Sequence, residues 1–147
     1  MKWIAIAALV GLVGTLGYLH DPPWLVRQTV GLRPQQTGPD GRRFRFSGMH
    51  AAFYVPSNAG EVRIPIATTF DDRGREPMIV TFWIDDVRAA RVLLSDPGWH
   101  DVDLTIPPRR WRRHVRVDVR TSIVRPDNHG VEIGEISCCS VPAGSTR

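Results

Sequence analysis

Residues 101–123 read DVDLTI-PPRR-WRRHVRVDVRTSI, and this stretch decides the fold. On both sides of the central PPRR segment, aliphatic residues recur at every second position between polar ones. Successive side chains of a β-strand point to opposite faces, so this alternation predicts two half-buried strands. We expect the two strands to form a hairpin around Pro107–Arg110, with Asp103 opposite His114 and the opposite charges fixing the register.

Alternation of the same kind continues on the N-terminal side of this stretch. Phe44 and Phe46 alternate with arginines, and we expect both phenylalanines in the core. Met78–Ile84 is apolar almost throughout, as in a central strand that is covered on both sides. Asp85-Asp86 then predicts a tight turn into the following strand.

Two residues predict irregularities in the sheet. Pro65 interrupts the alternating segment Val62–Ile66 and has no backbone N–H, which indicates an edge strand or a bulge. Gly134 lies where the apolar positions of Val131–Ile136 change phase, which indicates a second bulge.

The whole pattern predicts an all-β fold. About eight short strands separated by turn residues, with no helical period between them, indicate an antiparallel β-sandwich. A jelly-roll arrangement is our first choice and an immunoglobulin-like one the second. We place the sandwich at residues 42–137, a linker at residues 21–41 and a flexible tail at residues 138–147.

The N-terminus carries a different signal. Lys2 precedes an uncharged apolar run, Trp3–Leu19, which as a helix would span about 25 Å, slightly less than the hydrocarbon core of a bilayer. Residues 1–20 are therefore predicted to be a hydrophobic helix, either a transmembrane anchor or a cleaved signal peptide. Thr15–Gly17 is a poor cleavage site, which favours the anchor.

The same segment predicts where the domain lies. Lys2 on the N-terminal flank places the N-terminus in the cytoplasm, so a single-pass protein contacting the membrane through residues 3–19 holds its domain in the periplasm or outside the cell. Cleavage of a signal would instead give a secreted domain.

The charge of the chain excludes nucleic acid as the expected partner. The formal net charge is +4, and Lys2 is the single lysine. The arginines alternate with aspartates and form no basic stripe of the kind that tracks a phosphate backbone. An exported domain would meet anionic glycans or lipids instead.

The two cysteines, Cys138 and Cys139, are adjacent. The Cα atoms of neighbouring residues are about 3.8 Å apart, whereas an ordinary disulfide needs about 5.5 Å. The domain therefore has no predicted disulfide framework, and we favour two thiols near a loose C-terminus over a vicinal or intermolecular bridge.

No motif indicates catalysis, a metal or a cofactor. The histidines show no ligand spacing, and neither Gly-x-Ser-x-Gly nor a paired Cys-x-x-Cys motif occurs. The paired carboxylates are better explained as turns or as a charged strand face. We predict a non-enzyme with neither metal nor cofactor; the histidines are His20, His50, His100, His114 and His129.

Part of the chain resembles a known class of module. Two strands joined by Asp85-Asp86 lead into Gly98-Trp99-His100 and another strand, an order that resembles jelly-roll modules of the carbohydrate-binding type. The segment Pro126–Ile136 is similar to the end of the β-sandwich tails on some bacterial membrane glycosyltransferases, although Asn128-His129 stands where those tails have arginine and leucine.

This resemblance covers Met78–Ile136. It implies an accessory, non-catalytic sandwich and transfers no sugar specificity.

The first functional hypothesis is glycan binding at the cell envelope. Trp99 lies in a Pro-Gly turn, where its ring can be exposed to stack on a sugar. Asp127, Asn128 and His129 form a polar loop that can supply hydrogen bonds to hydroxyl groups. We name these four residues as the candidate ligand-binding site.

The second hypothesis is a structural or assembly subunit that docks on a larger membrane-protein partner. Its contact would be an arginine-rich strand face formed by Arg112, Arg116 and Arg120. The glycan and this protein are the two partners that the sequence predicts.

Overall fold

The computed structural model describes residues 2–20, 22, 24, 27–68, 77–124 and 129–139. These residues form one helix and ten strands, in the order α1 (Lys2–His20), β1 (Thr29–Leu32), β2 (Gln36–Thr37), β3 (Arg43–Pro56), β4 (Glu61–Ala67), β5 (Met78–Ile84), β6 (Val87–Leu94), β7 (Trp99–Thr105), β8 (His114–Thr121), β9 (Glu132–Gly134) and β10 (Ser137–Cys139). The predicted antiparallel β fold is confirmed, with ten strands in place of about eight.

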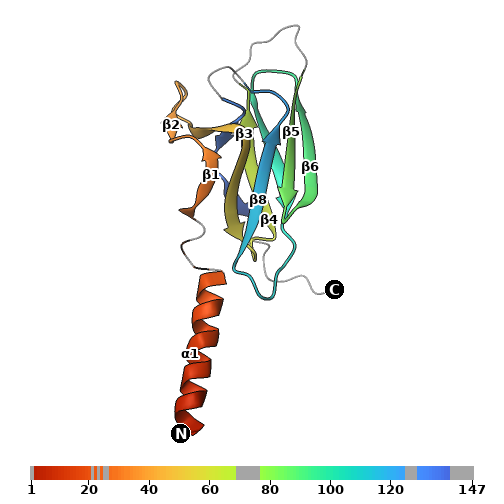
Figure 1. The fold of residues 1–147 in the computed structure, drawn as a ribbon. Coiled ribbons are helices and arrows are strands. Elements are labelled where there is room, and N and C mark those ends of the chain that lie inside the picture. Colours follow the sequence, from red (N-terminus) through yellow and green to blue (C-terminus); the bar gives the residue numbers. More distant parts are fainter. Residues whose placement is uncertain are drawn as a thin grey trace.

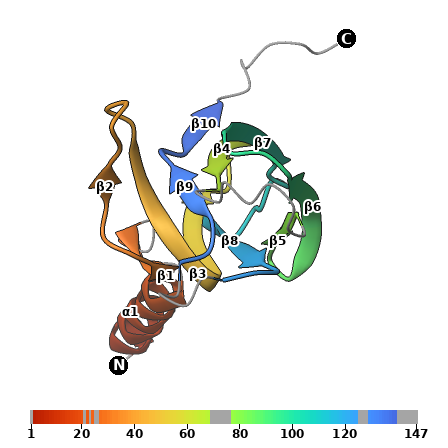
Figure 2. The same ribbon diagram turned by 90° about the horizontal axis from the view of Figure 1, so that it is seen from above.

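The strands curl into two layers that share β3 (Figures 1 and 2). In the first layer, which we call sheet A, β8 lies between the C-terminal half of β3 and β5, and β6 follows β5. In the second layer, sheet B, β9 lies between the N-terminal half of β3 and β4, and β7 pairs with the other side of β4. All these pairs are antiparallel.

A bend lets β3 belong to both layers. The bend lies at Ser47-Gly48, between the residues that pair with β9 and those that pair with β8. Ser47 is completely buried, and its hydroxyl and its backbone groups all bond to the segment before β9: the hydroxyl accepts from Val131 N, Ser47 N donates to Val131 O, and Ser47 O accepts from Gly130 N.

The core lies between the two layers. Alternate residues of β5 and β8 face those of β4 and β7, and their buried side chains are almost entirely aliphatic. The predicted period of two therefore holds along these strands; fully buried members include Phe82, Ile64, Ile66, Leu104, Val80, Val115, Val117 and Val119.

The predicted turn at Asp85-Asp86 is confirmed. Both residues have positive φ, 46° and 66°, as a two-residue type I′ hairpin requires, and the turn joins the paired strands β5 and β6.

Pro65 does not lie in an edge strand, because β4 has neighbours on both sides. It lies opposite the break between β9, which pairs with Ile66, and β10, which pairs with Arg63. A residue without an N–H is tolerated at such a break. The irregularity predicted at Gly134 is the end of β9.

The predicted hairpin of residues 101–123 is wrong. β7 pairs with β4 and β8 pairs with β3 and β5, so the two strands lie in opposite layers. Asp103 accepts two hydrogen bonds from Arg63, at 2.7 and 3.1 Å, and is not opposite His114. Alternation shows that each strand has one buried face, but two such strands can meet across a core as well as side by side.

Strands also occur in the segments predicted as linker and tail. β1 and β2 lie within residues 21–41 and pair with β3, and β10 includes Cys138 and pairs with β4. Gly31 has a φ of +68°, and a Cβ at this position would collide with the carbonyl oxygen of His50. The glycine therefore allows β1 to approach β3 closely.

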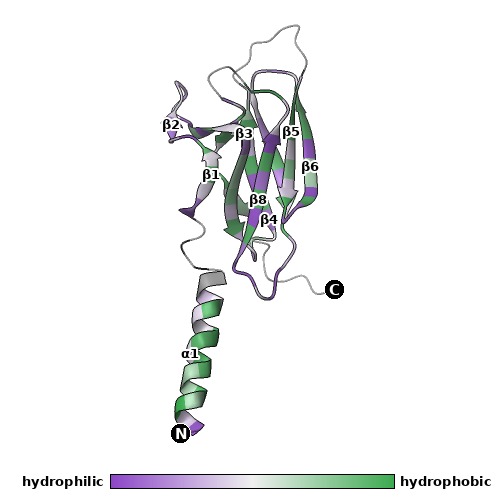
Figure 3. Cartoon of the chain, in the orientation of Figure 1, coloured by the Kyte–Doolittle hydropathy of each residue, from purple (hydrophilic) through white to green (hydrophobic). Residues whose placement is uncertain are grey.

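The helix α1 projects away from the two layers (Figure 1), and its hydrophobic residues are spread along its length (Figure 3). Large apolar side chains along it are exposed; Ile4 is 75% and Leu9 61% accessible. Among the described residues, no helix combines the length and the apolarity that a bilayer crossing requires. The anchor and the cleaved signal both stay predictions.

The pairing of β4 with β7 can be tested through pH. The hydrogen bonds from Arg63 lower the pKa of Asp103 below its ordinary value. A lowered folded-state pKa contributes stability that is present above the unfolded pKa, about 3.9, and is lost as pH falls through the folded pKa. We therefore expect Asp103→Asn to reduce the melting temperature slightly at pH 7, with no difference at about pH 2.

Arg63→Gln should show the same pH-dependent loss, and the double variant should lose no more than either single one. A loss shared with His114→Gln and not with Arg63→Gln would contradict the observed pairing.

Candidate ligand-binding surface

Four aromatic side chains follow one another across the outer face of sheet B. The rings of Trp99 and Phe44 have centroids 6.1 Å apart, and those of Phe44 and Phe46 are 5.3 Å apart and edge to face. His129 stacks on Phe46 at 4.3 Å with an interplanar angle of 12°. We call this set the aromatic row; it runs from the first residue of β7 to the segment before β9.

The expectation that Phe44 and Phe46 lie in the core is wrong. Arg45 stands opposite the buried Ile133, so the arginine lies on the core side of β3 and the two phenylalanines on the outer side. Their rings are half-buried by one another, by Trp99 and by His129. A period of two does not say which of its two faces points inward, and here the apolar face points outward.

Gly134, which has no side chain, allows Trp99 to lie close to the sheet. A Cβ at Gly134 would be 3.1 Å from Pro65 Cβ and 3.2 Å from Trp99 Cζ3, closer than ordinary van der Waals contact. Glycine at this position therefore lets the Trp99 ring pack over β9 beside Pro65.

Charged groups lie beside the same ring. The guanidinium carbon of Arg42 is 4.8 Å from the centroid of the Trp99 ring, a cation–π distance. Asp40 is 4.0 Å from Arg42 Nε, and both side chains are about half exposed, 56% and 48%. The site thus offers an aromatic ring together with a hydrogen-bond donor and an acceptor that are accessible to solvent.

Two of the predicted ligand-binding residues share this face. Trp99 and His129 form the two ends of the aromatic row, and Asp127 and Asn128 lie outside the described residues. The sequence analysis missed the phenylalanines between them. No signal in the sequence distinguishes an outward Phe-x-Phe from an inward one.

The predicted arginine face is only partly assembled. Arg116 and Arg120 lie on the outer face of β8, but Arg112 lies in the loop before this strand, 3.8 Å from Asp85. The three arginines therefore do not lie on one strand face, although Asp85 also donates its N–H to Arg116 O, at 3.2 Å. The strand β8 begins only at His114, so the alternation that places even-numbered residues on one face does not extend to Arg112.

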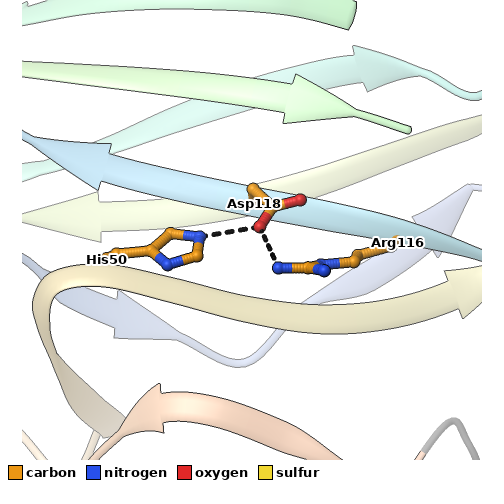
Figure 4. Close-up of polar contacts among 3 residues, drawn as sticks. All are labelled: His50, Arg116 and Asp118. Carbon is orange, nitrogen blue, oxygen red and sulfur yellow. Dashed lines mark hydrogen bonds and ion pairs between the residues drawn. The ribbon is translucent and has the colours of Figure 1, made fainter. Parts of the chain in front are cut away.

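Both arginines of β8 have contacts within the chain. Figure 4 shows Asp118, whose side chain is 4% exposed, between His50 and Arg116. A single carboxylate oxygen lies 2.6 Å from Arg116 Nη2 and 2.7 Å from His50 Nε2. Arg120 lies over the ring of Trp83, 5.0 Å from its centroid. These contacts give the arginines a structural role.

Within the described part of the chain, no group of three or more His, Cys, Asp or Glu side chains is arranged to hold a metal ion.

Comparisons with known proteins describe the fold only. No protein-family model and no curated protein matches the chain. Solved structures similar to it include the acetyl xylan esterase Est2A from the rumen bacterium Butyrivibrio proteoclasticus, with a TM-score of 0.43, 19% identity and coverage of 79% of this chain and 32% of the esterase. The chain thus spans about a third of that enzyme.

Two others are sugar-binding domains. They are CBM51 from Clostridium perfringens GH95 in complex with methyl-galactose, with TM-score 0.42, 8% identity and coverage of 69% and 77%, and the EclA C-terminal domain, a sugar-binding protein, with TM-score 0.42, 14% identity and coverage of 75% and 76%. At TM-scores below 0.5 the likeness carries no assignment of a ligand. The resemblance to glycosyltransferase tails stays a prediction.

The buried carboxylate of Asp118 should be important for stability. Asp118→Asn removes its charge, and with it two charge-assisted contacts in a solvent-excluded position, so we expect the free energy of unfolding to fall by about 1.5–3 kcal/mol. The control is Asp101→Asn, an exposed residue of β7, expected to change the free energy of unfolding by less than about 0.5 kcal/mol. Urea unfolding of both variants measures the difference, and equal effects would contradict the structural role of Asp118.

Proposed function

We propose that the domain binds a glycan on the outer face of sheet B, with the Trp99 ring at the centre of the contact. The observation that carries the proposal is the arrangement of Trp99, Arg42 and Asp40. A sugar presents C–H groups on one face and hydroxyl groups at its edge. An aromatic ring matches the first, and an exposed guanidinium and carboxylate match the second.

Binding on this ring requires Arg42 to move. Its side chain is half exposed and its contact with Asp40 is long, 4.0 Å, so the main cost of the movement is the cation–π contact with Trp99, about 0.5–1 kcal/mol at an exposed site. Once displaced, the guanidinium stays within reach of the sugar hydroxyls, because its backbone is held by the turn in which Arg42 N donates to Asp40 Oδ1. The apolar ring is then open to the ligand.

The remainder of the aromatic row extends the contact. Phe44, Phe46 and His129 continue the apolar surface beyond Trp99, which favours an oligosaccharide over a single sugar. Asp127 and Asn128 directly precede His129 in the sequence, and the proposal keeps them as groups that hydrogen-bond to sugar hydroxyls.

We also propose that the scaffold is a jelly roll. The two halves of β3 are counted here as separate segments. Following the chain from β3 to β9, each segment then lies in the opposite layer from the one before it, except that β5 and β6 form a hairpin within sheet A. Two interleaved four-segment sheets of this kind support the jelly roll over an immunoglobulin-like order.

The proposal includes the predicted location at the cell envelope, with residues 1–20 as an anchor or a cleaved signal. The non-catalytic role belongs to it as well. Docking on a protein partner through Arg116 and Arg120 has less support, because Asp118 and Trp83 already engage these guanidinium groups.

Replacing the central ring tests the proposal. We expect Trp99→Ala, in the full chain in detergent, to lower affinity for the bound glycan on an envelope-glycan array by at least about tenfold, which corresponds to about 1.4 kcal/mol of lost contact. Trp111→Ala is the matched control, because Trp111 is 92% exposed in a loop.

The control variant should bind like the wild type. The proposal fails if the wild type binds no envelope glycan, or if Trp111→Ala weakens binding as much as Trp99→Ala.

A further inference from the structure

A cavity that is partly open to solvent lies beside β3. It has a volume of about 740 Å³ and lies between β1, the two halves of β3 and the β9–β10 segment. Its wall is apolar over a large part of its area, with Leu32, Phe53, Val55, Ile133 and Ile136. The volume falls within the range of about 300–1,000 Å³ that is common for small-molecule sites.

Arg45 brings a positive charge into this cavity. It is half-buried and stands opposite Ile133, on the core side of β3. Among the residues that the structure describes, its guanidinium has neither a hydrogen bond nor an ion pair. The neighbouring Arg43 differs, since it pairs with Glu135.

An unpaired guanidinium beside apolar side chains is unfavourable. Moving a charge out of water costs free energy unless a counter-charge or hydrogen-bond acceptors compensate it. Arg27, an exposed residue that also lines the cavity, adds a second positive charge. The cavity therefore combines excess positive charge with an apolar wall.

We propose that this cavity binds a small organic anion. The charged head, a carboxylate or a phosphate, would pair with the guanidinium fork of Arg45, and the apolar body would lie against Phe53, Val55 and Ile133. Gln35 and Thr29, which also line the cavity, supply further hydrogen-bonding groups.

This site is centred on a different residue from the glycan surface. Arg45 lies on the core side of β3, whereas the Phe44 and Phe46 rings lie on the outer side. Phe44 also lines the cavity, so the two sites adjoin there, but the cavity lining does not include Trp99, Arg42 or Asp40. The inference therefore stands without the proposed function, and each can fail alone.

The test uses the full chain in detergent and four probes: 4-phenylbutyrate, phenyl phosphate, inorganic phosphate and the uncharged 4-phenylbutyramide. We expect calorimetry to show binding of at least one of the two phenyl anions, and the stronger of them identifies the head group. Arg45→Gln should weaken this binding by at least about tenfold. Arg91→Gln, an exposed arginine on β6, is the matched control and should leave it unchanged.

Stability provides the second readout. Because Arg45 has no partner that the substitution would leave unpaired, Arg45→Gln should melt no lower than the wild type, and Arg45→Lys should retain part of the binding. The inference is overturned if neither phenyl anion binds, if inorganic phosphate or the uncharged amide binds as well as they do, if Arg45→Gln binds normally, or if that variant is unfolded.

Discussion

The bend of β3 at Ser47-Gly48 is the constraint on which the architecture depends. A single strand belongs to both layers and pairs with β8 in one and with β9 in the other, so its direction on either side of the bend determines how the layers face each other. Ser47 is buried where a strand changes sheets, and a buried polar group at such a point must be bonded. Gly130 and Val131 provide those bonds, so the segment before β9 holds the bend in place.

The bend also explains why one strand carries two different surfaces. On the N-terminal half of β3, Arg45 stands opposite the buried Ile133 and lines the cavity. Phe44 and Phe46 turn outward, where Trp99 and His129 cover part of their area. Local patterning and global packing disagree here, and such disagreements are expected at functional sites.

Features of the fold that depend on a few neighbouring residues could be predicted from the sequence, whereas features that depend on residues far apart in the chain could not. The strands β5 to β8 and the Asp85-Asp86 turn could be predicted, because alternation and turn chemistry act over a few residues. The partner of β7 could not, because pairing is decided by packing across the core. The short strands β1, β2 and β10 have little alternation to detect. The position of Trp99 after Pro97-Gly98 suggested an accessible ring, whereas its packing beside Phe44 depends on which face of β3 points outward.

Two tryptophans carry an arginine over the ring, and their surroundings decide what each pair can do. At Trp83 the neighbouring carboxylate, Asp118, is 4% exposed and bonded to both Arg116 and His50, so that face of sheet A is held by contacts within the chain. At Trp99 the carboxylate beside the arginine is Asp40, which is 56% exposed and distant from its partner. The buried contacts beside Trp83 are those that Asp118 makes with Arg116 and His50, whereas displacing Arg42 from Trp99 would uncover a ring beside two exposed hydrogen-bonding groups. The same pair of residue types therefore lies beside a buried ion pair on sheet A and beside exposed charged groups on sheet B.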